Sequence, residues 1–270
     1  MSGRLREMFE SLKGQRAALI TYATGCYPGQ EESVQAALTM LENGADAVEI
    51  GVPFSDPVMD GPVIQEASAA ALAAGATPAK VLEAVSRVRA KTDKPILLMT
   101  YYNPDFHYGL IEFAREARGA GADGVIIPDL PAEEMGPWAA ASGEAGMDTV
   151  AFASLTSNDS RIREASRIST GFIYCIALLG TTGERERVSP ELPAFLARVR
   201  KLSEKPIAAG LGVSGPEQCR AVGQMADAVI VGSALVREMA RGEGDLSGLM
   251  ALTASLAGSL ALGSGPGEKA

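Results

Sequence analysis

The sequence of 270 residues predicts an α/β fold, namely a (β/α)8 TIM barrel with an extra N-terminal helix. Short apolar runs alternate with amphipathic segments along most of the chain, which is typical of parallel strands covered by helices. There are eight such runs, and the length of about 250 residues over which they are spread is that of one such barrel. A doubly wound open sheet is the alternative. No Gly-x-Gly-x-x-Gly motif follows the first apolar run, which disfavours a dinucleotide-binding fold.

Two short motifs recur at the starts of the apolar runs. Gly-Ala-Asp or Met-Ala-Asp precedes three of them, at residues 44–46, 121–123 and 225–227. Lys-Pro-Ile opens two others, at residues 94–96 and 205–207. At each place we expect a helix to end, a tight turn to follow and an apolar run to enter the sheet.

The elements follow from apolar spacing and from helix breakers. Leu5, Met8, Phe9 and Leu12 share one helical face and predict the extra helix. The eight strands are predicted near residues 19, 48, 97, 126, 150, 174, 207 and 229. Further helices are predicted at residues 33–43, 78–90, 109–118, 133–141, 161–168, 191–202, 216–222 and 246–262. No linker interrupts the pattern, so we expect one barrel domain over residues 1–262 and a disordered tail at 263–270.

Charge and hydropathy exclude several classes of function. The net charge of −9 disfavours nucleic acid and anionic membranes as partners, because both require a basic surface. The N-terminal segment lacks an apolar run of signal-peptide length, and no stretch is apolar enough to span a membrane. We therefore expect a cytoplasmic protein.

Cysteine and histidine usage narrows the chemistry further. The three cysteines, Cys26, Cys175 and Cys219, are too widely spaced for a disulfide framework or a metal knuckle. His107 is the single histidine, which argues against a Ser-His-Asp triad or a multi-histidine metal site. We expect no cofactor or metal in this chain, and acid–base chemistry that rests on carboxylates and tyrosine.

Residues 48–65 carry the main functional signal. Glu49 lies inside an apolar run, where burying an unpaired carboxylate is costly. The loop that follows contains three prolines, which stiffen it, and a second carboxylate at Asp60. A salt-bridged glutamate at the end of a strand is the alternative interpretation. Because the working residues of such barrels lie at the carboxyl ends of strands, the pattern favours an active site.

Two glycine-containing segments predict a phosphate site. Gly212 lies in the segment after the seventh predicted strand, and Gly232 and Ser233 follow the eighth, each near the start of a helix. Helix N-termini offer free N–H groups and a partial positive charge, and these two loops bind phosphate in many barrels. Simple turns are the alternative. The site would also let an acidic protein hold an anionic substrate.

The long loop at residues 177–190 predicts a mobile lid. It is rich in glycine, threonine and charge, and it is longer than a simple connection requires. Gly183 would add a further N–H to the phosphate when the lid closes. A disordered surface loop is the alternative.

The chain resembles the tryptophan synthase α subunit family over nearly its whole length. The motifs that carry the resemblance are EIGVPFSDP at residues 49–57, DGP at 60–62, MTYYNP at 99–104, IPDLP at 127–131, Thr-Gly at 182–183 and Gly-Ser at 232–233. The resemblance implies retro-aldol cleavage of indole-3-glycerol phosphate to indole and glyceraldehyde 3-phosphate. It also implies a pyridoxal-phosphate β subunit as partner, in an α2β2 heterotetramer that makes tryptophan.

The resemblance assigns roles to individual residues. Glu49 would shuttle protons, and Asp60 would bind the indole N–H. The remaining assignments are an indole pocket of Tyr22, Tyr101, Ile127, Tyr174 and Leu211, a phosphate site of Gly183, Gly212, Gly232 and Ser233, a lid with Thr181, Thr182 and Gly183, and a partner contact at Asp56 and Pro57. Core packing is the alternative for each pocket residue, and a solvated surface carboxylate is the alternative for Asp56.

The chain departs from the family pattern at several positions. Met59 replaces a usual alanine beside Asp60, and residues 25–27 (Gly-Cys-Tyr) replace a usual Ala-Gly-Asp. Leu211 replaces a usual phenylalanine, and Thr181 replaces a usual valine. Two further interpretations therefore stay open: a stand-alone lyase that releases free indole, and a weakly catalytic barrel that activates a β subunit.

Overall fold

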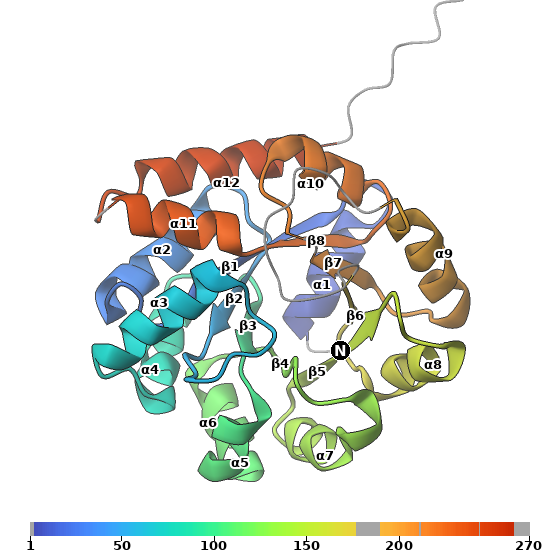
Figure 1. The fold of residues 1–270 in the computed structure, drawn as a ribbon, viewed down its shortest axis with the longest axis horizontal. Coiled ribbons are helices and arrows are strands. Elements are labelled where there is room, and N and C mark those ends of the chain that lie inside the picture. The colour runs from blue at the N-terminus through green and yellow to red at the C-terminus, as the bar shows by residue number, and fades with distance from the viewer. Residues whose placement is uncertain (1–2, 177–189, 211, 243, 262–270) are drawn as a thin grey trace, which may run out of the picture.

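The computed structural model describes residues 3–176, 190–210, 212–242 and 244–261. Within these ranges the chain forms a closed barrel of eight parallel strands in the order β1 to β8, and β1 pairs with both β2 and β8 (Figure 1). The strands are β1 Ala18–Thr24, β2 Ala47–Gly51, β3 Ile96–Met99, β4 Gly124–Ile126, β5 Asp148–Ser154, β6 Ile173–Ile176, β7 Ile207–Gly210 and β8 Ala228–Val231. The predicted (β/α)8 fold is confirmed.

Helices surround the barrel, and the first of them lies across one end of it (Figure 1). They are α1 Gly3–Leu12, α2 Gln30–Glu42, α3 Pro62–Ala73, α4 Pro78–Arg89, α5 Tyr102–Tyr108, α6 Leu110–Ala120, α7 Gly136–Glu144, α8 Asp159–Ile168, α9 Leu192–Leu202, α10 Pro216–Gly223, α11 Ser233–Gly242 and α12 Ser247–Leu260, with a 3-10 turn η1 at Ala132–Glu134. Among the helices described, none is both long and apolar enough to cross a membrane.

The helices differ from the sequence prediction in two respects. The helix predicted at 133–141 is divided into η1 and α7, because Pro137 occupies the first turn of α7 and begins a new helix there. Helices α3 and α5 lie in segments where no helix was predicted. Pro62 begins α3 rather than stiffening the preceding loop, and Pro104 lies within the first turn of α5.

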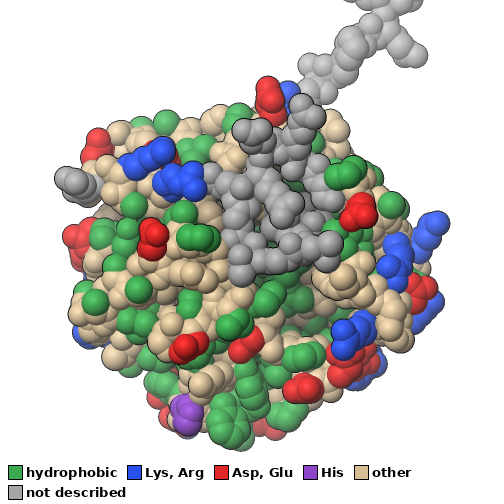
Figure 2. All heavy atoms as spheres, in the orientation of Figure 1, with side chains coloured by type: hydrophobic (Ala, Val, Ile, Leu, Met, Phe, Trp, Pro, Cys, Tyr) green, Lys and Arg blue, Asp and Glu red, His purple; other side chains and the backbone are tan. Residues whose placement is uncertain are grey.

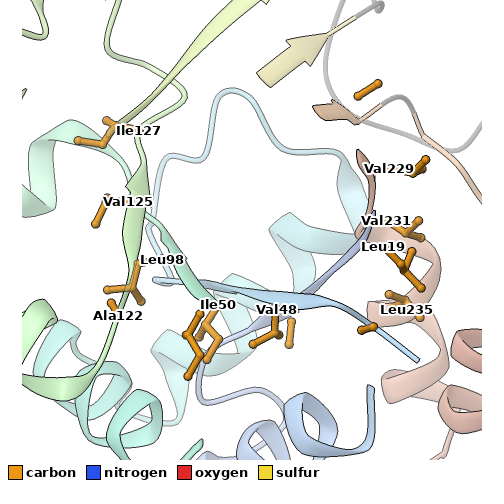
Figure 3. Packing of buried hydrophobic residues seen from close by; sticks show 14 of the residues in the cluster. Leu19, Val48, Ile50, Leu98, Ala122, Val125, Ile127, Val229, Val231 and Leu235 are labelled. Carbon is orange, nitrogen blue, oxygen red and sulfur yellow. The ribbon is translucent and has the colours of Figure 1, made fainter. Parts of the chain in front are cut away.

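Strand side chains alternate between two apolar layers. The inner layer fills the barrel and includes Ile20, Leu97, Ile126, Val150 and Ile230. The outer layer lies between the strands and the helices, and Figure 3 shows part of it, with Leu19, Val48, Leu98, Val125 and Val229. Because every strand is covered on both sides, its sequence is an almost continuous apolar run.

Helix α1 closes the amino end of the barrel. Leu5, Met8 and Phe9 are buried against the inner layer, and the ring of Phe9 lies 6.0 Å from that of Phe172. Arg4 adds an ion pair of 3.2 Å to the buried carboxylate of Asp123. The predicted extra helix is thus part of the core.

The three Ala-Asp motifs perform one structural task at this end of the barrel. Each aspartate precedes a strand, accepts the backbone N–H of a residue on the neighbouring strand and pairs with an arginine. The groups are Asp46 with Leu19 and Arg16, Asp123 with Ile96 and Arg89, and Asp227 with Ile207 and Arg200. These contacts hold β2, β4 and β8 in register with the strands before them.

Candidate active site

Glu49 is a buried carboxyl inside the barrel. It is the third residue of β2, it pairs with Tyr22 of β1 and Leu97 of β3, and it is 1% exposed. Its Oε2 is buried without a hydrogen-bond partner among the described residues. Burial, followed by the nearby charge of Asp60, raises the pKa of Glu49 to about 8. The group is therefore protonated near neutral pH and able to give up its proton.

Asp60 lies beside Glu49, in the loop after β2. It is 4% exposed, and its Oδ2 accepts a hydrogen bond of 3.0 Å from the phenol of Tyr101. Its Oδ1 is buried and has no partner in the described part of the chain. Burial raises the pKa of Asp60 to about 6, and the hydrogen bond from Tyr101 opposes this rise. Asp60 is therefore ionised at neutral pH, while Glu49 is protonated.

Tyr101 holds the loop that carries Asp60 in position. Its phenol oxygen also accepts the backbone N–H of Met59 at 3.1 Å, and its ring stacks on Phe54 at 5.2 Å between centroids. The side chain of Gln65 donates to the carbonyl of Asp60 at 2.9 Å. The end of β3 and the start of α3 thus hold the loop from both sides. The phenol of Tyr101 is bonded to this loop through Asp60 and Met59. The sequence predicted Tyr101 only as a contact of the indole and did not predict these bonds.

Tyr22 on β1 and Tyr174 on β6 both lie near enough to the two carboxyls to be affected by their charge. Burial raises the pKa of both phenols well above the ordinary range, and the charges of Asp60 and Glu49 add to this effect. Each ring has room because a glycine lies under its hydroxyl. A Cβ on Gly51 would lie 2.1 Å from the Tyr22 oxygen, and a Cβ on Gly210 would lie 2.4 Å from the Tyr174 oxygen.

The prediction that Ile127 lines the indole pocket is wrong. This residue is fully buried in the outer layer, with Val125 and Leu98, and faces the helices rather than the barrel (Figure 3). Ile126 faces the interior instead, because it pairs with Met99 and both belong to the inner layer.

Two half-buried interior residues were missed by the sequence prediction. Phe152 of β5 stacks on Tyr174, with centroids 4.7 Å apart and planes 24° apart. Met99 of β3 packs on both the inner layer and the cluster of Tyr22 and Ile64. Strand alternation, once anchored at Glu49 and Tyr22, is the signal that finds them.

The predicted phosphate residues follow β7 and β8. Gly212 has a left-handed φ of +68°, a conformation that favours glycine. Ser233 is the first residue of α11, whose opening N–H groups lack intrahelical acceptors. A Cβ on Gly232 would lie 3.5 Å from Tyr22 Cβ and 3.7 Å from Ile64. The start of α11 therefore adjoins the aromatic side of the interior.

The predicted partner contact lies on the outer part of the loop after β2. Asp56 is exposed, accepts a 2.5 Å hydrogen bond from Ser55 and precedes the half-buried Pro57. Val58, which follows Pro57, is an apolar side chain that is 65% exposed. On the face drawn in Figure 2, acidic side chains are scattered, and basic side chains gather at the upper left and along the right edge.

Several predictions lie outside the described residues, namely those for Thr181, Thr182, Gly183, Leu211 and the tail at 263–270. Within the described ranges, no three His, Cys, Asp or Glu side chains are grouped as a metal site would require. Cys26, Cys175 and Cys219 are buried free thiols.

The chain is similar to known proteins over most of its length. The family model described as tryptophan synthase alpha chain matches residues 8–259. The tryptophan synthase alpha chain of Mycobacterium avium is 43% identical over 257 residues, which cover 95% of this chain and 94% of the relative. That of Geotalea daltonii is 41% identical over 237 residues, which cover 87% of this chain and 90% of the relative.

Solved structures give the same result. A chain of Mycobacterium tuberculosis tryptophan synthase has a TM-score of 0.90 and 40% identity, covering 97% of this chain and 100% of that one. Tryptophan synthase subunit alpha of Legionella pneumophila has a TM-score of 0.88 and 32% identity, covering 96% of this chain and 98% of that one.

Proposed function

The chain belongs to the tryptophan synthase alpha chain family, a lyase family of tryptophan biosynthesis, and we propose that Glu49 and Asp60 carry its reaction. The reaction is the retro-aldol cleavage of indole-3-glycerol phosphate to indole and glyceraldehyde 3-phosphate. The observation that supports this assignment is a pair of adjacent buried carboxyls with different pKa values, about 8 for Glu49 and about 6 for Asp60.

Glu49 acts first as an acid and then as a base. Cleavage requires a proton on the indole ring carbon that bears the side chain, and the removal of a proton from the adjacent side-chain hydroxyl. Protonated Glu49 gives its proton to the ring carbon, and the carboxylate that results takes the hydroxyl proton as the carbon–carbon bond breaks. The electrons of that bond return to the indole ring, and Glu49 ends protonated as it began.

Asp60 stabilises the charge that forms during the reaction. Protonation of the ring carbon places positive charge on the indole nitrogen. An ionised carboxylate that accepts the indole N–H stabilises this charge, and most strongly in a buried site. Oδ1 of Asp60 is free for this contact in the described structure, while Oδ2 is held by Tyr101.

The remaining groups bind the two ends of the substrate. Tyr22, Tyr174 and Phe152 offer aromatic surface to the indole ring, and Leu211 completes this part of the proposal. Gly212, Gly232 and Ser233, with Gly183, bind the phosphate through backbone N–H groups and the dipole of α11. Tyr101 acts mainly by holding Asp60.

The partner is a pyridoxal-phosphate β subunit in a cytoplasmic α2β2 heterotetramer, which takes up the indole. Asp56 and Pro57 form part of the contact, next to the exposed Val58. The chain itself needs no cofactor, because Glu49 supplies both the acid and the base and Asp60 stabilises the charge that forms.

The test is an assay of indole release from indole-3-glycerol phosphate by the full chain, with and without a β subunit. Glu49→Gln should lower the rate at least about a hundredfold, the usual contribution of an acid–base group. Binding of glycerol phosphate and the circular dichroism spectrum should be retained. A variant that keeps more than a tenth of the wild-type rate would contradict the role of Glu49. Full activity without a β subunit would favour the stand-alone lyase, and wild-type inactivity would favour the activator.

A further inference from the structure

A third buried carboxyl, Asp105, lies close to the active site but takes no part in the chemistry above. It is 1% exposed, in the first turn of α5. Its Oδ1 lies 2.9 Å from the hydroxyl of Thr100, and its Oδ2 is buried with no partner in the described part of the chain. An ionised carboxylate with one bare oxygen is costly at such a site, and the neutral acid is much less so.

The hydroxyl of Thr100 lies between two oxygens. It is 2.9 Å from Oδ1 of Asp105 and 3.3 Å from the carbonyl oxygen of Tyr101. A hydroxyl has one proton to donate, so it cannot donate to both at once. If Asp105 is ionised, Thr100 donates to it and can no longer donate to the carbonyl. If Asp105 is neutral, its O–H donates to Thr100, and Thr100 donates to the carbonyl. The neutral acid satisfies both contacts.

The carbonyl of Tyr101 and the N–H of Tyr102 belong to one peptide group. That N–H donates a hydrogen bond of 2.9 Å to Oδ1 of Asp129, so the peptide group is held on both sides. Its orientation directs the side chain of Tyr101, the phenol of which binds Asp60. Burial raises the pKa of Asp105 well above its ordinary value, the hydrogen bond from Thr100 opposes this, and the charge of Asp129 adds to it.

We propose that Asp105 is a positioning residue, a neutral carboxylic acid that donates to Thr100 and through it fixes the Tyr101 peptide and the position of Asp60. Its effect on rate rests on the proposed function, since it acts through Asp60. Asp105 and Thr100 touch neither the substrate nor the reacting atoms.

The kinetic test breaks the series of contacts at two points. Asp105→Ala and Thr100→Val should each lower kcat about tenfold with KM within about twofold, because small displacements of a catalytic group are costly to the rate. Asp105→Asn should keep at least about half of kcat, because its amide N–H₂ donates to Thr100 as the neutral acid does. Ser142→Ala is the matched control. It removes a buried hydroxyl that binds the Met147 carbonyl at the amino end of β5, and kcat should be unchanged.

A double-mutant cycle with Tyr101→Phe separates positioning from general destabilisation. The Phe ring cannot bind Asp60, so Asp105→Ala should have little further effect on kcat in that background. An equal tenfold loss in both backgrounds would overturn the proposal. So would an Asp105→Asn variant as slow as Asp105→Ala, since the amide N–H should replace the O–H of a neutral acid.

An infrared measurement tests the protonation state without relying on activity. In the Glu49→Gln, Asp60→Asn background, the absorption of a neutral carboxylic acid should remain at pH 7 and should disappear when Asp105→Asn is added. Absence of this band before that change would overturn the proposal. If the band is present but the wild-type chain releases no indole, the proposed function fails while the protonation state of Asp105 stands.

Discussion

The phenol of Tyr101 donates a hydrogen bond of 3.0 Å to Oδ2 of Asp60 and so joins the end of β3 to the loop after β2. The same oxygen accepts the N–H of Met59 at 3.1 Å. Tyr101 therefore influences the position of Asp60 and also its pKa, because the hydrogen bond favours the ionised carboxylate that burial disfavours.

The first prediction concerns the pH dependence of kcat/KM. Activity requires ionised Asp60 and protonated Glu49, so it should fall below about pH 6 and above about pH 8. Tyr101→Phe removes the hydrogen bond that lowers the Asp60 pKa, so the acidic limb should move to higher pH. The two carboxyls interact, so the apparent pKa that each limb reports is a property of the pair and not of one residue. Steady-state rates from pH 5 to 9 measure both limbs, and an unmoved acidic limb in the variant would contradict the role of Tyr101.

The second prediction concerns stability. The folded-state pKa of Glu49, about 8, lies above its ordinary value of 4.5, so the fold disfavours the ionised form. The wild-type free energy of unfolding should therefore fall as pH rises from about 4.5 to about 8. The difference corresponds to at most about 5 kcal/mol. Glu49→Gln lacks this loss, so urea unfolding should show it to be more stable than wild type at pH 8.5 and similar at pH 5. An equal difference at both pH values would exclude this origin.

The third prediction concerns the space beside Tyr22. A Cβ on Gly51 would lie 2.1 Å from the Tyr22 oxygen and 2.7 Å from its Cζ. Gly51→Ala should therefore lower the free energy of unfolding by about 1–3 kcal/mol, as overpacking does, and should slow catalysis. Tyr22→Leu in the same chain should restore stability, whereas Tyr22→Phe should not, because Cζ remains. Gly119→Ala in α6 serves as the control, because its Cβ would meet nothing within 4 Å. Calorimetry measures both variants, and a Gly51→Ala variant as stable as Gly119→Ala would disprove the clash.

The fourth prediction tests the phosphate site. Gly232→Asp places a negative charge where the substrate phosphate should bind, and it repels that phosphate. A charge-assisted hydrogen bond contributes about 1.5–3 kcal/mol, so KM should rise about tenfold or more. Gly232→Ala is the control, because its Cβ would make only ordinary contacts of 3.5 Å or more. An unchanged KM in the aspartate variant would mean that the substrate phosphate binds elsewhere.

The fifth prediction concerns the partner. Asp56 lies on the exposed part of the loop that carries Asp60. Partner binding at Asp56 should tighten this loop and bring Asp60 into register. Asp56→Ala should leave the slow indole release of the isolated chain unchanged and reduce the acceleration by a β subunit. A titration with β subunit measures this, and full acceleration at an unaltered midpoint would make Asp56 a bystander.

The sequence predicts the barrel well, because each buried strand is an apolar run between breakers. It could not predict which way Ile126 and Ile127 face, since both layers are apolar and only the pairing of β4 with β3 distinguishes them. The role of Tyr101 was also out of reach, because it depends on a hydrogen bond to a residue 41 positions away. By contrast, α3 was readable: its buried residues Ile64, Ala67, Ser68 and Ala71 have helical spacing.

The aspartates before β2, β4 and β8 should keep their end of the barrel closed during local unfolding. The N–H groups they bind, on Leu19, Ile96 and Ile207, should be among the last to exchange with deuterium, through global unfolding only. The loops at the opposite rim carry Glu49's neighbours but none of these contacts. Mutational tolerance should therefore differ between the rims, and loops from another barrel could be grafted onto the reactive rim while the strand register is retained.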